Sequence, residues 1–184
     1  MFGIDPGLTR CGLGVIEVDH LKKIKVVNYS TEGTSAKMPL EDRLFHIHKV
    51  IDQWFDKYQP DALAIERVFY NQNVSTAMAT AQVVGIAMVA AKTRDIPVET
   101  YTPPEIKSSV TGYGKADKAA VTKMVMKFLK LKEKPETADA ADSLAIALTH
   151  AWRRTPQSKT GTNTMTSAQK KWIAAELEVK ARNK

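Results

Sequence analysis

Four acidic residues stand where an ordinary solvated charge is not expected: Asp5, Glu66, Asp139 and Asp142. Asp5 ends a short apolar segment immediately before a Pro-Gly turn, and Glu66 ends another apolar run. Asp139 and Asp142 are three residues apart in a segment with helical periodicity, so they share one face of that helix. The other residues of this segment are apolar nearly all round, which is typical of a buried helix.

Taken singly, each acid has a structural interpretation, as a turn residue, a strand-end cap or a charge at a helix N-terminus. Two like charges on one face of a buried helix repel each other, and burying them without a counter-charge costs several kcal/mol each. A divalent cation removes that penalty, so a shared metal site is the better interpretation of the four together. Oxygen ligands without a cysteine or histidine cluster favour a hard ion, Mg²⁺ or Mn²⁺. Four carboxylates balance the charge of two such ions, an arrangement used for in-line phosphoryl displacement.

The secondary structure that must position these acids begins with several strands, after which helices and strands alternate. Short apolar or alternating runs predict strands over Phe2–Asp5, Cys11–Val18, Lys23–Thr31, Asp61–Glu66 and Pro97–Tyr101. Apolar residues at helical spacing predict helices over Pro39–Tyr58, Asn73–Lys92, Asp117–Lys130 and from Glu136 to about Arg153. A meander followed by alternating helices and strands predicts an α/β domain with a mixed five-stranded sheet flanked by helices.

Length and charge indicate one domain followed by a basic tail. A chain of 184 residues with 43% hydrophobic and 26% charged residues suits a single globular core. After Arg154 the composition shifts to Thr, Ser, Gln, Gly and Asn, so we expect a folded domain over residues 1–153 and a flexible tail over 154–184. Residues 153–184 hold eight Lys or Arg and two Glu, and therefore most of the net charge of +7. This charge favours a polyanionic partner.

The sequence also predicts the cellular setting. The longest apolar run, Val83–Ala91, is shorter than the roughly 20 residues that a membrane helix needs. A single cysteine, Cys11, excludes an internal disulfide framework and a cysteine-built zinc site. We therefore expect a cytoplasmic protein that does not associate with a membrane.

Three motifs that occur in register resemble the RuvC family of crossover (Holliday) junction endodeoxyribonucleases. They are the opening run Gly3–Gly12 (GIDPGLTRCG), the strand end Ile65–Glu66 and the run Ala138–Ala145 (ADAADSLA). The resemblance covers about residues 2–153. It implies an RNase H-like fold, and hence a nuclease domain over residues 1–153.

The resemblance further implies an activity. It points to an Mg²⁺-dependent homodimer that makes paired, symmetric nicks in a four-way DNA junction, leaving 5′-phosphate and 3′-hydroxyl ends, in DNA recombination and repair. By motif position, the catalytic and metal-binding quartet falls on Asp5, Glu66, Asp139 and Asp142. We expect two Mg²⁺ ions per subunit, with Mn²⁺ as a substitute, and the RuvA–RuvB branch-migration complex as an implied partner.

Five residues are candidates for DNA contacts. By resemblance, Phe69 matches an aromatic that is inserted against unstacked junction bases, where stacking is worth roughly 1–3 kcal/mol. Lys107 and Lys118 match basic residues near the scissile phosphate. Arg67 follows the second acid directly, and Lys115 lies in a glycine-bearing loop that is expected to be mobile. Lysine on a surface is usually just solvated, so for Lys115 the structural interpretation is equally good.

The segment from Met78 to Ala91 is rich in alanine and methionine, and we expect it to form the dimer interface, with burial in the core as the alternative. A twofold dimer suits a four-way junction because each subunit meets one of two equivalent strands.

Three other functions also fit parts of the sequence. The run from Asp5 to Gly12 also looks like the phosphate hairpin of actin-like sugar kinases, but those proteins need two such domains and do not explain Asp139 with Asp142. A different RNase H-like nuclease that acts on RNA–DNA hybrids, or a non-catalytic junction-binding protein, are the remaining alternatives.

Overall fold

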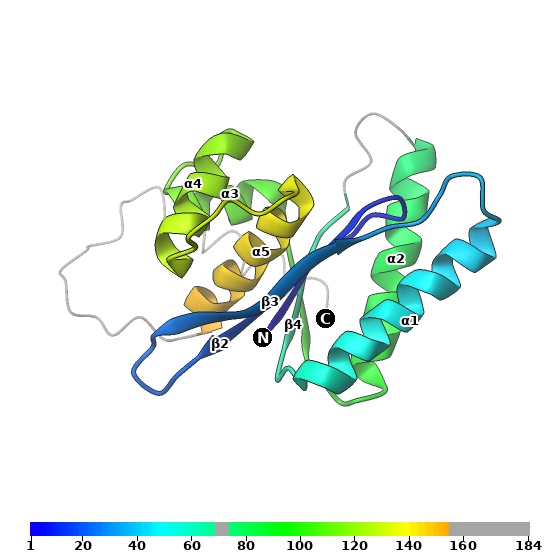
Figure 1. Cartoon of the computed structure of the whole chain (residues 1–184), viewed down its shortest axis with the longest axis horizontal. Helices are drawn as coiled ribbons and strands as arrows, with labels where there is room; N and C mark the ends of the chain where they lie inside the picture. The colour runs from blue at the N-terminus through cyan, green and yellow to red at the C-terminus, as the bar shows by residue number, and fades with distance from the viewer. Residues whose placement is uncertain (69–73, 155–184) are drawn as a thin grey trace, which may run out of the picture.

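The computed structural model describes residues 1–68 and 74–154. At its centre is a five-stranded sheet with the order β3-β2-β1-β4-β5 (Figure 1). The strands are β1 (Phe2–Asp5), β2 (Cys11–Val18), β3 (Ile24–Glu32), β4 (Leu63–Glu66) and β5 (Val98–Tyr101). The first three form an antiparallel meander, whereas β4 pairs parallel to β1 and β5 pairs parallel to β4. The predicted mixed five-stranded sheet is thereby confirmed.

Helices cover both faces of this sheet (Figure 1). One face is covered by α1 (Leu40–Tyr58) and α2 (Val74–Lys92), and the other by α3 (Pro103–Thr111), α4 (Lys118–Leu129) and α5 (Ala138–Arg154). Each layer has its own apolar core, so the sheet is buried on both sides, as the apolar strand sequences require.

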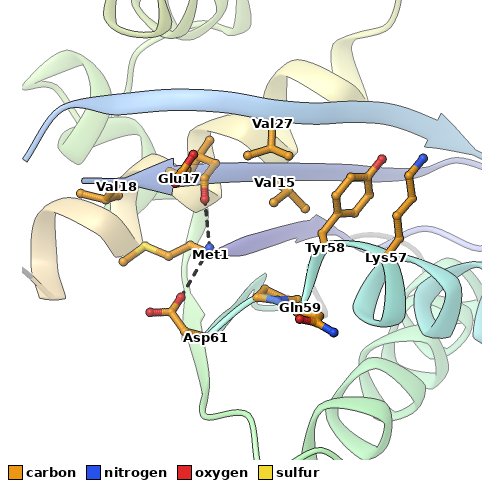
Figure 2. A pocket seen from close by; sticks show the side chains of 11 residues that line it. Met1, Val15, Glu17, Val18, Val27, Lys57, Tyr58, Gln59 and Asp61 are labelled. Atoms are coloured by element: carbon orange, nitrogen blue, oxygen red, sulfur yellow. Dashed lines mark hydrogen bonds and ion pairs between the residues drawn. The ribbon is translucent and has the colours of Figure 1, made fainter. Parts of the chain in front are cut away.

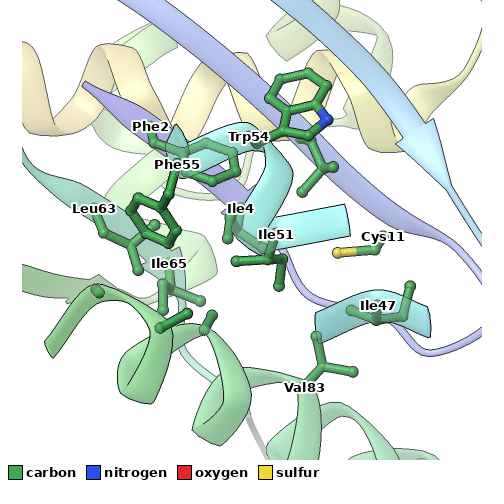
Figure 3. Packing of buried hydrophobic residues seen from close by; sticks show 14 of the residues in the cluster. Phe2, Ile4, Cys11, Ile47, Ile51, Trp54, Phe55, Leu63, Ile65 and Val83 are labelled. Atoms are coloured by element: carbon green, nitrogen blue, oxygen red, sulfur yellow. The ribbon is translucent and has the colours of Figure 1, made fainter. Parts of the chain in front are cut away.

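The core beneath α1 and α2 fixes the start of β1 (Figure 3). Phe2 stacks on Trp54 with ring centroids 5.6 Å apart and meets Phe55 edge-on at 5.3 Å. Cys11 is buried in the same cluster, and this burial raises the pKa of its thiol to about 12. Aromatic packing at this end holds β1 in place, so the strand delivers the carboxylate at its far end to a fixed position.

The starts of α3 and α5 carry capping interactions that the sequence prediction did not use. α3 was not predicted, yet Thr102 and Glu105 form a capping box, in which the Thr102 amide donates to Glu105 Oε2 at 2.8 Å. α5 begins at Ala138 rather than Glu136, because Thr137 Oγ1 accepts a hydrogen bond from the Ala140 amide at 3.2 Å. The expected tail, residues 154–184, lies outside the described residues from position 155 onward.

The helix α2 has one buried and one exposed apolar face. Over Ser75–Lys92 it is long and apolar enough to cross a membrane by length and composition alone. Val83 and Ala87 are fully buried in the core with α1, and a core helix passes the same test, so this is weak support for a membrane span. A second set of residues is exposed, and we call it the α2 outer face: Met78, Gly85, Met88 and Val89.

Candidate active site

The sheet topology brings Asp5 and Glu66 together although they are far apart in the sequence. Asp5 ends β1 and Glu66 ends β4, and these two strands are parallel neighbours with Ile4 paired to Ile65. The carboxyl ends of neighbouring parallel strands meet at one edge of a sheet, which is where α/β proteins place their ligands. The two strand-end acids therefore lie side by side.

Glycines in the β1–β2 hairpin let α5 approach so closely that its acids join this edge. A Cβ added at Gly12 would lie 2.0 Å from the Asp139 carbonyl oxygen and 3.2 Å from the Asp5 Cβ. At Gly3, the added Cβ would lie 2.2 Å from the Ser143 carbonyl oxygen. Any larger residue would push the helix away, so these glycines set the position of Asp139 relative to Asp5.

The electrostatics of Asp5 show that all four acids share one environment. Burial is the main cause that raises the pKa of Asp5 to about 8, and repulsion from Glu66, Asp142 and Asp139 raises it further. Burial also raises the pKa of Glu66 to about 7, with a contribution from Asp142. Lys118 opposes both shifts, but it does not cancel them. Either a bound proton or a bound cation would relieve this repulsion, so the two compete for these carboxyls.

Two of the four acids are held by basic side chains. Arg10 Nε lies 3.1 Å from Asp139 Oδ2, and Lys118 Nζ lies 3.0 Å from Asp142 Oδ2. Asp139 Oδ2 is nevertheless buried without a hydrogen bond in the described part of the chain. Within residues 1–68 and 74–154, no three acidic, histidine or cysteine side chains are arranged around one ion position.

This donor set fits a hard divalent ion. The acids are oxygen donors, Asp5 is buried with a raised pKa, and Asp139 Oδ2 is an acceptor without a donor. A cation bound by these groups would relieve their mutual repulsion and would give Asp139 Oδ2 the partner that it lacks.

The predicted DNA-contacting residues differ in how they are placed: two interact with the acids, and two others are exposed. Lys118 bonds to Asp142, and half-buried Lys107 on α3 is near enough to Glu66 to oppose the rise of the pKa of that acid. Arg67 is exposed, and its guanidinium donates to Thr100 Oγ1 at 3.2 Å at the end of β5. Lys115 is exposed in the connection between α3 and α4. The predicted stacking residue, Phe69, lies outside the described residues.

Sequence reasoning did not single out Arg10. It lies in the turn that follows β1, in the middle of the Gly3–Gly12 motif, and nothing in its spacing distinguishes it from a solvated arginine. Only the packing of α5 against the β1–β2 hairpin brings Asp139 to it.

A cavity of about 490 Å³ lies at the opposite end of the sheet, where β1 and β4 begin (Figure 2). The Met1 ammonium donates to the Ile16 carbonyl at 2.9 Å there and lies 3.5 Å from Asp61 Oδ1. None of the four acids lines this cavity, so it is separate from the candidate active site.

Comparison with known proteins places the chain in a family. Residues 1–150 match the family model described as crossover junction endodeoxyribonuclease RuvC. A protein of Renibacterium salmoninarum with the same description is 50% identical over 180 residues, which covers 98% of this chain and 93% of the relative.

Solved structures agree with this match. RuvC of T. thermophilus in complex with a Holliday junction substrate superimposes with a TM-score of 0.78 at 36% identity, covering 83% of this chain and 92% of that one. The yeast mitochondrial Holliday junction resolvase Ydc2 matches with a TM-score of 0.60 at 16% identity, which supports the fold alone. With the sheet, the placement of the acids and these matches in agreement, the chain belongs to the RuvC family of crossover junction endodeoxyribonucleases and has its RNase H-like fold.

Proposed function

We propose that this protein resolves four-way DNA junctions by metal-dependent, paired and symmetric hydrolysis of two phosphodiester bonds. The observation that carries this proposal is the convergence of two strand-end acids and two acids of α5 in one electrostatic environment at one edge of the sheet. The expected products carry 5′-phosphate and 3′-hydroxyl ends, and the process served is DNA recombination and repair.

Asp5, Glu66, Asp139 and Asp142 would hold two Mg²⁺ ions per subunit, with Mn²⁺ as a substitute. Four negative charges match two divalent ions, and oxygen ligands suit both metals. When bound, such ions supply a nucleophilic water and stabilise charge on the departing oxygen. The chain itself contributes a buried setting in which the raised pKa values of Asp5 and Glu66 keep these carboxyls ready to exchange protons for a cation.

Basic residues around the acids would hold the DNA backbone. Lys107 and Lys118 both interact electrostatically with Glu66, so each would be near enough to attract a phosphate bound at the acids. Arg67 and Lys115 are exposed farther out and would contact flanking phosphates. Phe69 is proposed to stack on an unpaired junction base.

We further propose a homodimer that forms through the α2 outer face. Exposed Met78, Met88 and Val89 present an apolar surface, and a Cβ added at Gly85 would meet nothing within 4 Å in the single chain. Close helix approach at a twofold axis would bury this surface and give two active sites for two equivalent strands. A cytoplasmic location and the RuvA–RuvB complex as a partner complete the proposal.

The decisive experiment compares substrates at equal concentration in Mg²⁺. A mobile four-way junction, a linear duplex of the same sequence and an RNA–DNA hybrid are incubated with the protein, and the ends of the products are mapped. Symmetric nicks with 5′-phosphates on the junction alone would support the proposal. Cleavage of the hybrid instead would favour another RNase H-like nuclease, and junction binding without any cleavage would favour a non-catalytic binding protein.

A further inference from the structure

Arg10 forms an ion pair with Asp139. Its Nε lies 3.1 Å from Asp139 Oδ2, although the arginine side chain is 70% exposed and that of the aspartate only 13%. The Lys118–Asp142 pair has the same form, with an exposed cation reaching a mostly buried acid. Each of the two acids of α5 is thus paired with one exposed cation.

An ion pair of this form is easily exchanged. Arg10 reaches inward from solvent, and pairs with an exposed partner contribute little to stability. Asp139 Oδ2 accepts no hydrogen bond in the described part of the chain. The arginine therefore offsets the negative charge of this oxygen but does not donate a hydrogen bond to it. An arginine does not lose its proton, so it cannot remain beside Asp139 as a neutral group when a divalent ion arrives.

Release of Arg10 creates a cation without a partner at the rim of the active site. With two divalent ions bound, the four carboxylates are neutralised, and the guanidinium has no acid left to face. A DNA phosphate offers that partner, and the guanidinium fork matches the oxygens of a phosphate.

We propose that Arg10 is a placeholder for metal. It pairs with Asp139 until a divalent ion binds there and, once the ion has displaced it, binds a phosphate of the DNA substrate. The proposal rests on the proposed function, because it takes the metal and the DNA from there. It makes metal binding and DNA binding mutually reinforcing through one positioning residue, and such coupling acts equally in both directions.

The first test measures metal binding without DNA. Mn²⁺ is titrated calorimetrically into the parent protein, Arg10→Gln, Arg10→Lys and the charge-matched control Lys57→Gln, whose residue lines the cavity at the opposite end of the sheet. Arg10→Gln removes the competitor, so we expect Mn²⁺ to bind roughly two- to fivefold more tightly, the range typical of one exposed ion pair. Arg10→Lys and Lys57→Gln are expected to remain close to the parent.

The second test measures the affinity for an immobile four-way junction with and without Ca²⁺, with the recovered DNA checked for nicks. Without metal, Arg10 is tied to Asp139, so Arg10→Gln should bind the junction about as well as the parent. With Ca²⁺, the variant should bind roughly fivefold more weakly than the parent, because one phosphate contact is missing. Lys57→Gln should leave the ratio of the two affinities unchanged.

Two results would overturn the placeholder role. Unchanged Mn²⁺ affinity in Arg10→Gln would show that the arginine does not compete for Asp139. An equal loss of junction affinity with and without Ca²⁺ would show a general charge effect. Neither result bears on the proposed function, which fails separately if the parent protein leaves the junction uncut in Mg²⁺.

Discussion

Individual residues at the sheet edge combine burial and like charge, which either a bound proton or a bound cation relieves. Burial, and to a lesser extent repulsion from neighbouring acids, raises the pKa of Asp5 to about 8 and that of Glu66 to about 7, well above those of free carboxyls. The unfolded chain ionises these groups first, so between about pH 4 and pH 8 the folded state binds more protons than the unfolded state. The active site therefore lowers the stability of the metal-free protein as the pH rises through this window.

This titration predicts a pH-dependent metal affinity. Below about pH 7 an incoming ion must displace protons from Asp5 and Glu66, so Mn²⁺ affinity should rise with pH and level off above about pH 8. Calorimetry in buffers of different ionisation enthalpy counts the protons released. Thermal unfolding without metal should show a midpoint that falls over the same range and recovers with saturating Mn²⁺. A metal affinity that stays flat from pH 6 to pH 8 would contradict this assignment.

Asp142→Asn tests the metal-binding role proposed for the acids of α5. The variant loses one charge of the ligand set while its shape is kept, so we expect junction binding to persist and cleavage to fall on the order of 10²-fold or more. Cleavage is measured in Mg²⁺ on a mobile junction, and binding by gel shift. Asp95→Asn is the matched control, because Asp95 is exposed beside Lys92 after α2. Equal nicking by Asp142→Asn and the parent would exclude a metal-binding role for Asp142.

Part of this site could be predicted from the residue types in the sequence. The helix pair Asp139 and Asp142 was recognisable because a structural role explains two like charges on an otherwise apolar helix less well than a metal site does. The ion pair of Arg10 was not recognisable, since it depends on a contact between chain segments that are more than a hundred residues apart.

At the scale of elements, the site depends on how closely α5 lies on the β1–β2 hairpin. The long, strongly periodic helices and the apolar strands were predicted within a few residues, because their patterns are local. The mutual approach of α5 and the hairpin was not predicted, since the glycines in β1 and β2 could equally mark flexible positions. α3 was missed although the sequence Thr102-Pro-Pro-Glu105 carries a helix start signal.

Gly12→Ala tests this approach. The new methyl would lie 2.0 Å from the Asp139 carbonyl oxygen, so α5 must shift outward and carry Asp139 with it. We expect a loss of about 2 kcal/mol or more in the free energy of unfolding, measured with urea, together with weakened Mn²⁺ binding. Gly114→Ala is the milder comparison, because its added Cβ would lie 3.3 Å from the Pro104 carbonyl oxygen, a tight contact that a shift of a few tenths of an ångström relieves. Equal stability of the two variants would show that the close approach is not required.

At the scale of the whole molecule, the sheet is covered by helices on both faces, and the α2 outer face remains exposed in the single chain. The α2 outer face lies on the layer of α1 and α2, whereas the α5 acids come from the opposite layer (Figure 1). Pairing of two chains through α2 would therefore leave the acids of both subunits accessible to DNA.

Val89→Glu tests the dimer. Val89 is 63% exposed on the α2 outer face, and a charge there would oppose burial against a second chain. Light scattering is expected to give twice the chain mass of 20.4 kDa for the parent and the single mass for the variant. The variant should also produce single nicks instead of paired ones. Leu21→Glu is the matched control, because Leu21 is equally exposed at 63% in the β2–β3 connection and should leave the mass unchanged. A dimeric Val89→Glu variant would place the interface elsewhere.

The order in which the acids occur along the chain has a consequence for biosynthesis. A ribosome that has passed Glu66 has made only two of the four proposed ligands, and the other two follow on the last described helix, α5. If the proposed ligand set is right, a nascent chain or a fragment truncated before position 139 would hold too few acids to assemble the metal site. Nuclease activity would then begin only when synthesis of the domain is nearly complete.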